Sequence, residues 1–226
     1  MKKILAILLS GALAFASCSL PETIYKLNNV GDYMNFKEGI LANDFGTEFT
    51  VKEDLSDAKW QVEGNRFYAV FDVLNINYDI TLKSYINATV KAPAGEITED
   101  QTPASDPVQI SDCSISGGFL NVIFTYYYKP GTECPHNTDL YYLDNAADGS
   151  LTLRLVHEGG GENLVNMEED ILKSTSTFLC FPLTGLVPAG EMRSVFLECE
   201  LLIKEKAGEY TSEHKKAPLY TQQIQF

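Results

Sequence analysis

The segment Tyr78–Lys91 constrains the fold more than any other part of the chain. One row of its side chains holds Tyr78, Ile80, Leu82, Ser84, Ile86, Ala88 and Val90, and mainly polar residues alternate with them. Period two over this length is typical of a half-buried antiparallel strand. A strand this long, bent at Ser84, is expected to curve round a small barrel.

The second half of the chain contains shorter segments with the same alternation. They are Leu120–Tyr128, Leu151–His157, Thr177–Leu183 and Val195–Ile203. One short helix is predicted, over Asn166–Ser174. Short strands separated by turn residues, with almost no helix, predict an all-β protein whose second half is an antiparallel β sandwich.

The first eighteen residues have the order of a secretory signal. Lys2 and Lys3 precede an apolar run, Ile4–Ala14, and small residues precede Cys18. The run is too short for a permanent transmembrane helix. Its end looks like a bacterial lipobox, so Cys18 is the predicted lipidation site, carrying acyl chains such as palmitate. We therefore expect anchoring to the outer membrane through an N-terminal lipid, and the sequence leaves open whether the protein faces the periplasm or the cell surface.

The charge balance narrows the class of partner. The chain has 17 Lys and Arg against 31 Asp and Glu, a net charge of −14. Nucleic-acid binding needs a cationic surface, so no nucleic-acid partner is expected. Hydrophobic residues make up 45% of the chain, which is enough for packed cores.

Four cysteines remain after the predicted lipidation site, and all lie in the second half. They are Cys113, Cys134, Cys180 and Cys199. An even number in an exported chain permits disulfides, and three pairings are possible. Alternation with Leu197 and Leu201 also allows Cys199 to be a buried apolar residue. The sequence leaves both interpretations open.

Several motifs, taken together, resemble the NigD-like lipoproteins of Bacteroides and its relatives. They are Asp44-Phe45-Gly46-Thr47, Gly64-Asn65-Arg66-Phe67-Tyr68, the Tyr78–Lys91 strand, Ser116-Gly117-Gly118-Phe119-Leu120-Asn121-Val122 and Leu153-Arg154-Leu155-Val156-His157. The resemblance implies an N-terminal OB-like small barrel followed by a C-terminal β sandwich. It carries over no catalytic residues.

With this resemblance the chain divides into five parts. Residues 1–17 are the predicted signal peptide, 18–35 a tether and lead-in, 36–100 the OB-like barrel, 101–107 a linker and 108–226 the sandwich. The linker is placed where Pro, Gly and acidic residues replace the alternating pattern.

The search for reactive residues predicts no catalytic residue, no metal and no cofactor. His136 lies two positions after Cys134, but the intervening Pro135 indicates a turn rather than a zinc site. His157 falls in the buried row of its segment, which indicates a structural histidine. The possible binding residues are aromatic: Tyr127, Tyr141 and Tyr142 could stack on a glycan or a protein partner.

The sequence therefore favours a non-enzymatic cell-envelope lipoprotein that acts as a binding or scaffolding module for an envelope protein or a glycan. The alternative is a bacteriocin-immunity or secretion-accessory lipoprotein, which rests on the association of the resembling family with a bacteriocin operon. A carbohydrate-active enzyme is a third, weaker hypothesis.

Overall fold

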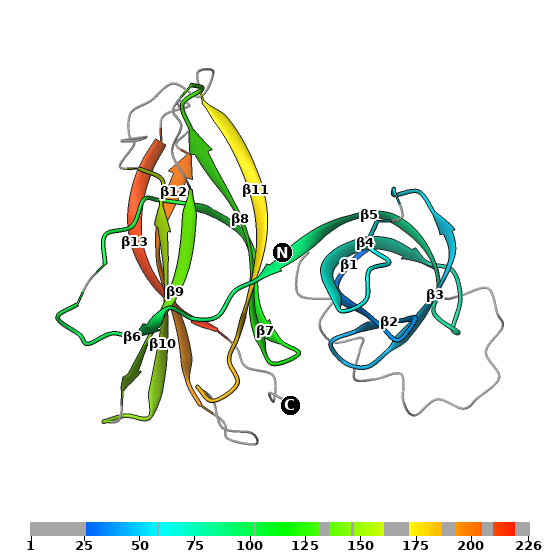
Figure 1. The fold of residues 1–226 in the computed structure, drawn as a ribbon, viewed down its shortest axis with the longest axis horizontal. Coiled ribbons are helices and arrows are strands. Elements are labelled where there is room, and N and C mark those ends of the chain that lie inside the picture. The colour runs from blue at the N-terminus through cyan, green and yellow to red at the C-terminus, as the bar shows by residue number, and fades with distance from the viewer. Residues whose placement is uncertain are drawn as a thin grey trace.

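The computed structural model describes residues 26–57, 59–101, 103–131, 136–145, 147–160, 172–186, 193–204 and 210–219. In this part of the chain all regular structure is β, arranged as a barrel and a sandwich that lie side by side (Figure 1). None of these residues belongs to a helix that is long and apolar enough to cross a membrane. The predicted all-β class is confirmed.

Five strands form the barrel. They are β1 (Leu27–Lys37), β2 (Ile40–Asn43), β3 (Glu48–Asp54), β4 (Asn65–Val73) and β5 (Asp79–Val90). Four antiparallel pairings link them in the order β3-β2-β1-β4-β5, and a parallel pairing of β3 with β5 closes the ring. A closed five-stranded barrel with this order is OB-like. Apolar side chains, including the single tryptophan Trp60, fill its centre.

The other strands form the two layers of the sandwich. They are β6 (Gly95–Glu96), β7 (Gln109–Ser116), β8 (Phe119–Tyr128), β9 (Asn137–Asn145), β10 (Ser150–Glu158), β11 (Lys173–Pro182), β12 (Val195–Lys204) and β13 (Tyr210–Leu219). One layer has the order β11-β8-β7 and the other β13-β12-β10-β9-β6. The apolar rows expected from the sequence meet between the layers, for example Phe124, Leu153 and Leu197.

A β-bulge divides β5 into two halves with different environments. Phe71 of β4 is opposite Leu82, whereas Val70 is opposite Ser84, so Lys83 is the extra residue. The prediction of one continuous face from Tyr78 to Val90 is therefore wrong beyond Leu82. After the bulge, Tyr85 packs against the barrel core, and Ile86 packs outside it.

Two boundaries differ from the expected ones. β1 begins at Leu27, inside the segment 18–35 that was assigned to a tether, because the turn-prone Asn29 (φ 54°) is absorbed as an irregularity within the strand. β6 pairs with β9, so the chain has joined the sandwich by Gly95, before the expected linker 101–107.

The helix predicted over Asn166–Ser174 is wrong at its C-terminal end. Lys173 and Ser174 begin β11 and pair with Tyr128 and Tyr127 of β8. The continuous ladder between β11 and β8 overrides the local helical pattern. Residues 166–171 lie outside the described residues.

A buried ion pair from the barrel lies at the junction with the sandwich. Arg66 of β4 donates to both carboxylate oxygens of Asp44, at 2.6 and 2.7 Å, and the two side chains are only 4% and 1% exposed. The sandwich completes the network, because Arg66 also donates to Asn121 (2.8 Å) and Ser116 donates to Asp44 (2.5 Å). Burial alone would raise the pKa of Asp44, but the hydrogen bonds and charge of Arg66 outweigh it and lower that pKa.

Apolar contacts and shared main-chain pairing surround this network. Tyr33 of β1 packs against Phe178 and Cys180 of β11, and the Arg66 guanidinium lies 4.6 Å from the ring centre of Phe119. The end of β5 extends from the barrel to the sandwich and pairs with β11, so one sheet runs through both domains (Figure 1).

Candidate functional site

The partner of β5 changes along one of its edges. β3 pairs with residues 79–82 and β11 with residues 88–90. Between them, Lys83–Asn87 have β4 on their other edge but no strand on this one within the described part of the chain. We call these five residues the β5 window.

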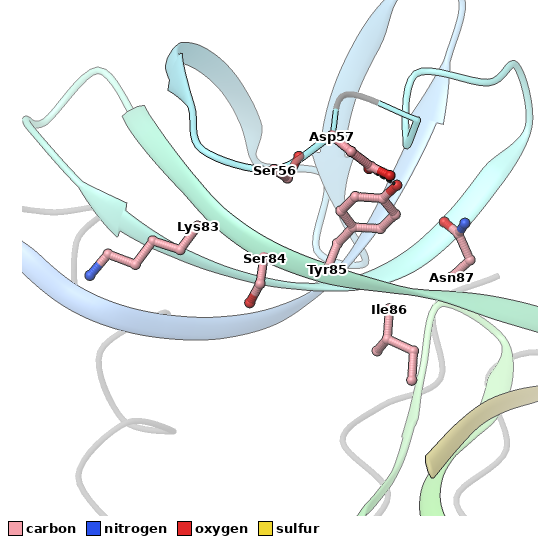
Figure 2. Close-up of a pocket in the computed structure, with 7 residues that line it drawn as sticks. All are labelled: Ser56, Asp57, Lys83, Ser84, Tyr85, Ile86 and Asn87. Atoms are coloured by element: carbon pink, nitrogen blue, oxygen red, sulfur yellow. Dashed lines mark hydrogen bonds between the residues drawn. The ribbon is translucent and has the colours of Figure 1, made fainter. Parts of the chain in front are cut away.

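A hollow of about 460 Å³ lies in front of the β5 window. Its walls are the window itself and Ser56 and Asp57, which come from the segment after β3. Figure 2 shows Tyr85 pointing toward Asp57 and Ile86 pointing the opposite way. The hollow is shallow and open to solvent.

Main-chain groups of the window face this hollow. On the same edge, the Leu82 carbonyl accepts from Leu55 before the bulge and the Lys91 amide donates to Cys180 after it. The main-chain groups of successive residues in a strand point alternately to its two edges. The bulge at Lys83 shifts this alternation by one residue, so the N–H and C=O groups of Tyr85 and Asn87 point to this edge. Because Phe178 of β11 pairs with Ala88, the Phe178 amide donates to the Asn87 C=O. Among the described residues, the Tyr85 N–H and C=O and the Asn87 N–H have no strand partner on this edge.

The charged side chains around the window already have partners. The Tyr85 hydroxyl donates to Asp57 at 2.5 Å, which lowers the pKa of Asp57 to about 2 and raises the pKa of Tyr85 to about 12. Lys83 forms an ion pair with Asp72 at 2.7 Å. Ser84 is exposed, so the free polar groups at the site are neutral. The arrangement can exchange hydrogen bonds with an uncharged ligand.

A second cluster of titratable groups lies at the end of the sandwich. His136 Nδ1 is 3.3 Å from His157 Nε2, Thr138 Oγ1 is 2.8 Å from His157 Nδ1, and the ring of Tyr126 stacks on His136. Burial and the neighbouring His136 lower the pKa of His157 to about 4. His157 is thus the buried, hydrogen-bonded histidine that its row predicted. The described residues contain no group of three that could hold a metal ion.

The structure does not bring the three candidate tyrosines into one surface. Tyr127 lies on β8, donates to Gln109 at 3.1 Å and packs against Tyr210. Tyr141 and Tyr142 lie on β9, in the other layer, and Tyr142 packs against the sandwich core. All three are half-buried, and their role in binding stays a prediction.

The described cysteines are free thiols. Cys113, Cys180 and Cys199 form no disulfide with one another. Burial raises the pKa of Cys180 and of Cys199 to about 11, so neither is a reactive thiolate at neutral pH. Cys18 and Cys134 lie outside the described residues, so lipidation and any bridge to Cys134 stay predictions.

The sandwich matches a known family. Residues 89–186 match the model of the NigD-like C-terminal β-sandwich domain. This part of the chain is a NigD-like C-terminal domain. The resemblance inferred from the sequence motifs is confirmed, and the match begins where β5 leaves the barrel.

Solved structures share the fold of most of the chain. A protein described as toxin-related, from Parabacteroides distasonis, is 19% identical with a TM-score of 0.56, over 84% of this chain and 93% of that one. A NigD-like immunity protein from Bacteroides caccae is 15% identical with a TM-score of 0.53, over 86% and 99%. A protein described as a lipoprotein, from Bacteroides fragilis, is 11% identical with a TM-score of 0.50, over 87% and 99%. No curated protein matches the chain.

Proposed function

We propose that this protein is a non-enzymatic lipoprotein of the cell envelope that acts as a binding or scaffolding module. The observation that carries the proposal is the junction between the domains. Arg66 and Asp44 of the barrel are buried against Ser116 and Asn121 of the sandwich, and β5 pairs with β11. Domains joined in this way present their surfaces in a fixed arrangement, which lowers the entropy lost when a partner binds.

The proposed anchor sets where this module acts. Leu27, where β1 begins, follows Cys18 by nine positions. Even a fully extended chain of that length spans only about 30 Å. Acylation of Cys18 would therefore hold the barrel close to the outer-membrane surface, on its periplasmic or its cell-surface side. The lipoprotein description of the similar Bacteroides fragilis structure supports this proposal.

Acyl labelling and cross-linking in the same cells test both parts of the proposal. Cells fed an alkyne fatty acid express the wild-type chain or Cys18→Ser, and intact envelopes are then cross-linked. We expect label on the wild-type protein only, together with the same cross-linked envelope protein or glycan in replicate preparations. An unlabelled wild-type protein would contradict the anchor, and a labelled protein without a reproducible partner would contradict the binding role.

A role in immunity or secretion is the second candidate function. It is favoured by the fold shared with the NigD-like immunity protein from Bacteroides caccae. If it holds, expression of this chain should protect a sensitive strain from a bacteriocin whose genes lie beside its own. Full sensitivity with and without the protein would reject it.

A further inference from the structure

We propose that the β5 window is a docking site for an extended polypeptide segment of a partner protein, which adds to the sheet between β3 and β11. The inference rests on the proposed binding function and names the surface that performs it. An unpaired strand edge is a template for another chain, and folded proteins normally cover such edges.

The neighbouring strands define the space that the segment would occupy. β3 and β11 both run parallel to β5 on the same edge, one before the window and one after it. A strand inserted between them would continue a ladder that is interrupted for five residues, or about 16 Å of extended chain. The outward N–H and C=O of Tyr85 and the N–H of Asn87 offer two donors and one acceptor, which match the main chain of a peptide.

The electrostatics favour an uncharged main chain over a charged ligand. Asp57 is engaged by Tyr85 and by Lys59, and Lys83 is engaged by Asp72. The hollow in front of the window therefore offers neutral hydrogen-bonding groups, and the net charge of −14 opposes anionic ligands.

The position of the window also favours a partner protein. It adjoins the junction where β5 passes from the barrel to β11, so its two ends are held by different domains. A site held at both ends by packed strands is already ordered before binding, which favours the docking of a flexible segment.

Peptide selection tests the proposal directly, since it does not require the identity of the partner. Random nine-residue peptides are displayed and selected on the full chain carrying Cys18→Ser, and the enriched peptides are synthesised as probes. Ser84→Arg places a long charged side chain at an exposed position of the hollow, and Asn87→Arg does so at a second position. The matched control is Ser212→Arg, at an exposed position of β13 in the sandwich.

We expect the selected peptides to bind the parent chain and Ser212→Arg equally and to bind both window variants at least tenfold more weakly. Hydrogen exchange should slow at the amides of Tyr85 and Asn87 when peptide binds. In an extended peptide only every second N–H faces the neighbouring strand. We therefore expect N-methylation at one set of alternate positions to abolish binding, and N-methylation at the other set to leave it intact.

Three results would overturn the proposal. In the first, no selected peptide binds the parent chain more tightly than Ser84→Arg. In the second, peptide binding slows hydrogen exchange only at amides outside the window. In the third, the chain associates with itself and Ser84→Arg abolishes that association. The last would identify a second copy as the occupant. These results are independent of acyl labelling and envelope cross-linking, so failure of the window is distinguishable from failure of the proposed function.

Discussion

At the scale of single residues, the most consequential interaction is the pair formed by Arg66 and Asp44. Both side chains are almost fully buried, so each has lost its hydration. Hydrogen bonds from Asn35 and Ser116 to Asp44, and from Arg66 to Asn121, replace the lost water. This network specifies how the two surfaces meet, because any other arrangement of the domains would lose the hydrogen bonds of Ser116 and Asn121 to the buried pair.

Removing one member of the pair should therefore be costly. Arg66→Met keeps most of the side-chain volume but leaves the Asp44 carboxylate buried alone, and we expect the free energy of unfolding to fall by about 3–5 kcal/mol. Urea denaturation at neutral pH measures it. Lys37→Met removes an exposed pair with Glu38 and should change stability far less. Equal, small losses in the two variants would contradict the structural role of the buried pair.

The lowered pKa of His157 predicts that stability falls with decreasing pH. The unfolded imidazole binds a proton near pH 6.5, whereas the native one, with its pKa lowered to about 4, does so only in stronger acid. Below pH 6.5 the unfolded state binds more protons, so this group lowers stability as the pH falls from about 6.5 to about 4. Its contribution between pH 7 and pH 5 is about 2 kcal/mol.

Denaturation of the wild type and His157→Asn at pH 7 and pH 5 isolates this contribution, because the carboxylates are common to both proteins. The variant should be less stable at pH 7, since Thr138 and His136 lose their partner, but it should lose about 2 kcal/mol less on acidification. The same pH dependence in both proteins would show that His157 is not the group responsible.

Residue patterns predicted burial better than they predicted partners. The alternating row correctly placed His157 in the core. The partners of Arg66 could not be predicted, because Asp44 and Asn121 are 22 and 55 positions away and only the folded topology brings them together. For the same reason the sequence could not exclude a bridge among Cys113, Cys180 and Cys199.

At the scale of single elements, the turn between β7 and β8 supports the junction. Gly117 has a positive φ of 56°, which residues other than glycine adopt at a cost. A side chain there would also meet the network, because an added Cβ would lie 2.6 Å from Asp44 Oδ1. The turn that joins β7 to β8 thus has a second role in the junction.

Two glycine-to-alanine variants separate these effects. Gly149 lies in the turn between β9 and β10 with φ 71° and has open space around it, so Gly149→Ala meets only the backbone strain. Gly117→Ala should lose about 1–3 kcal/mol more, because it also displaces Asp44 from Arg66. Thermal or urea denaturation of both variants measures the difference, and equal losses would mean that the turn does not hold the carboxylate in place.

β5 shows what a local pattern can and cannot reveal about an element. Its alternation identified a long strand of a barrel, and it is one. The bulge at Lys83 depends on the register with β4, so the sequence of β5 alone could not predict that Tyr85 turns inward. The β5 window was missed for the same reason, since an unpaired edge is a property of three strands from distant parts of the chain.

At the scale of the whole molecule, the two domains are expected to behave as one body. Periodicity and the family resemblance predicted a barrel and a sandwich, but not the way they meet. The junction combines the Arg66 network, the apolar cluster around Phe178 and the pairing of β5 with β11. A binding module with this construction should hold the β5 window in one fixed position relative to the sandwich.

The coincidence of two unfolding transitions tests this claim most directly. Trp60 is the only tryptophan, and it is buried in the barrel, so its fluorescence reports barrel unfolding, whereas far-ultraviolet circular dichroism reports both domains. We predict that the two urea transitions of the wild type coincide and that Arg66→Met separates them. Fluorescence and dichroism midpoints that already differ in the wild type would show that the barrel and the sandwich are independent, and would contradict the account.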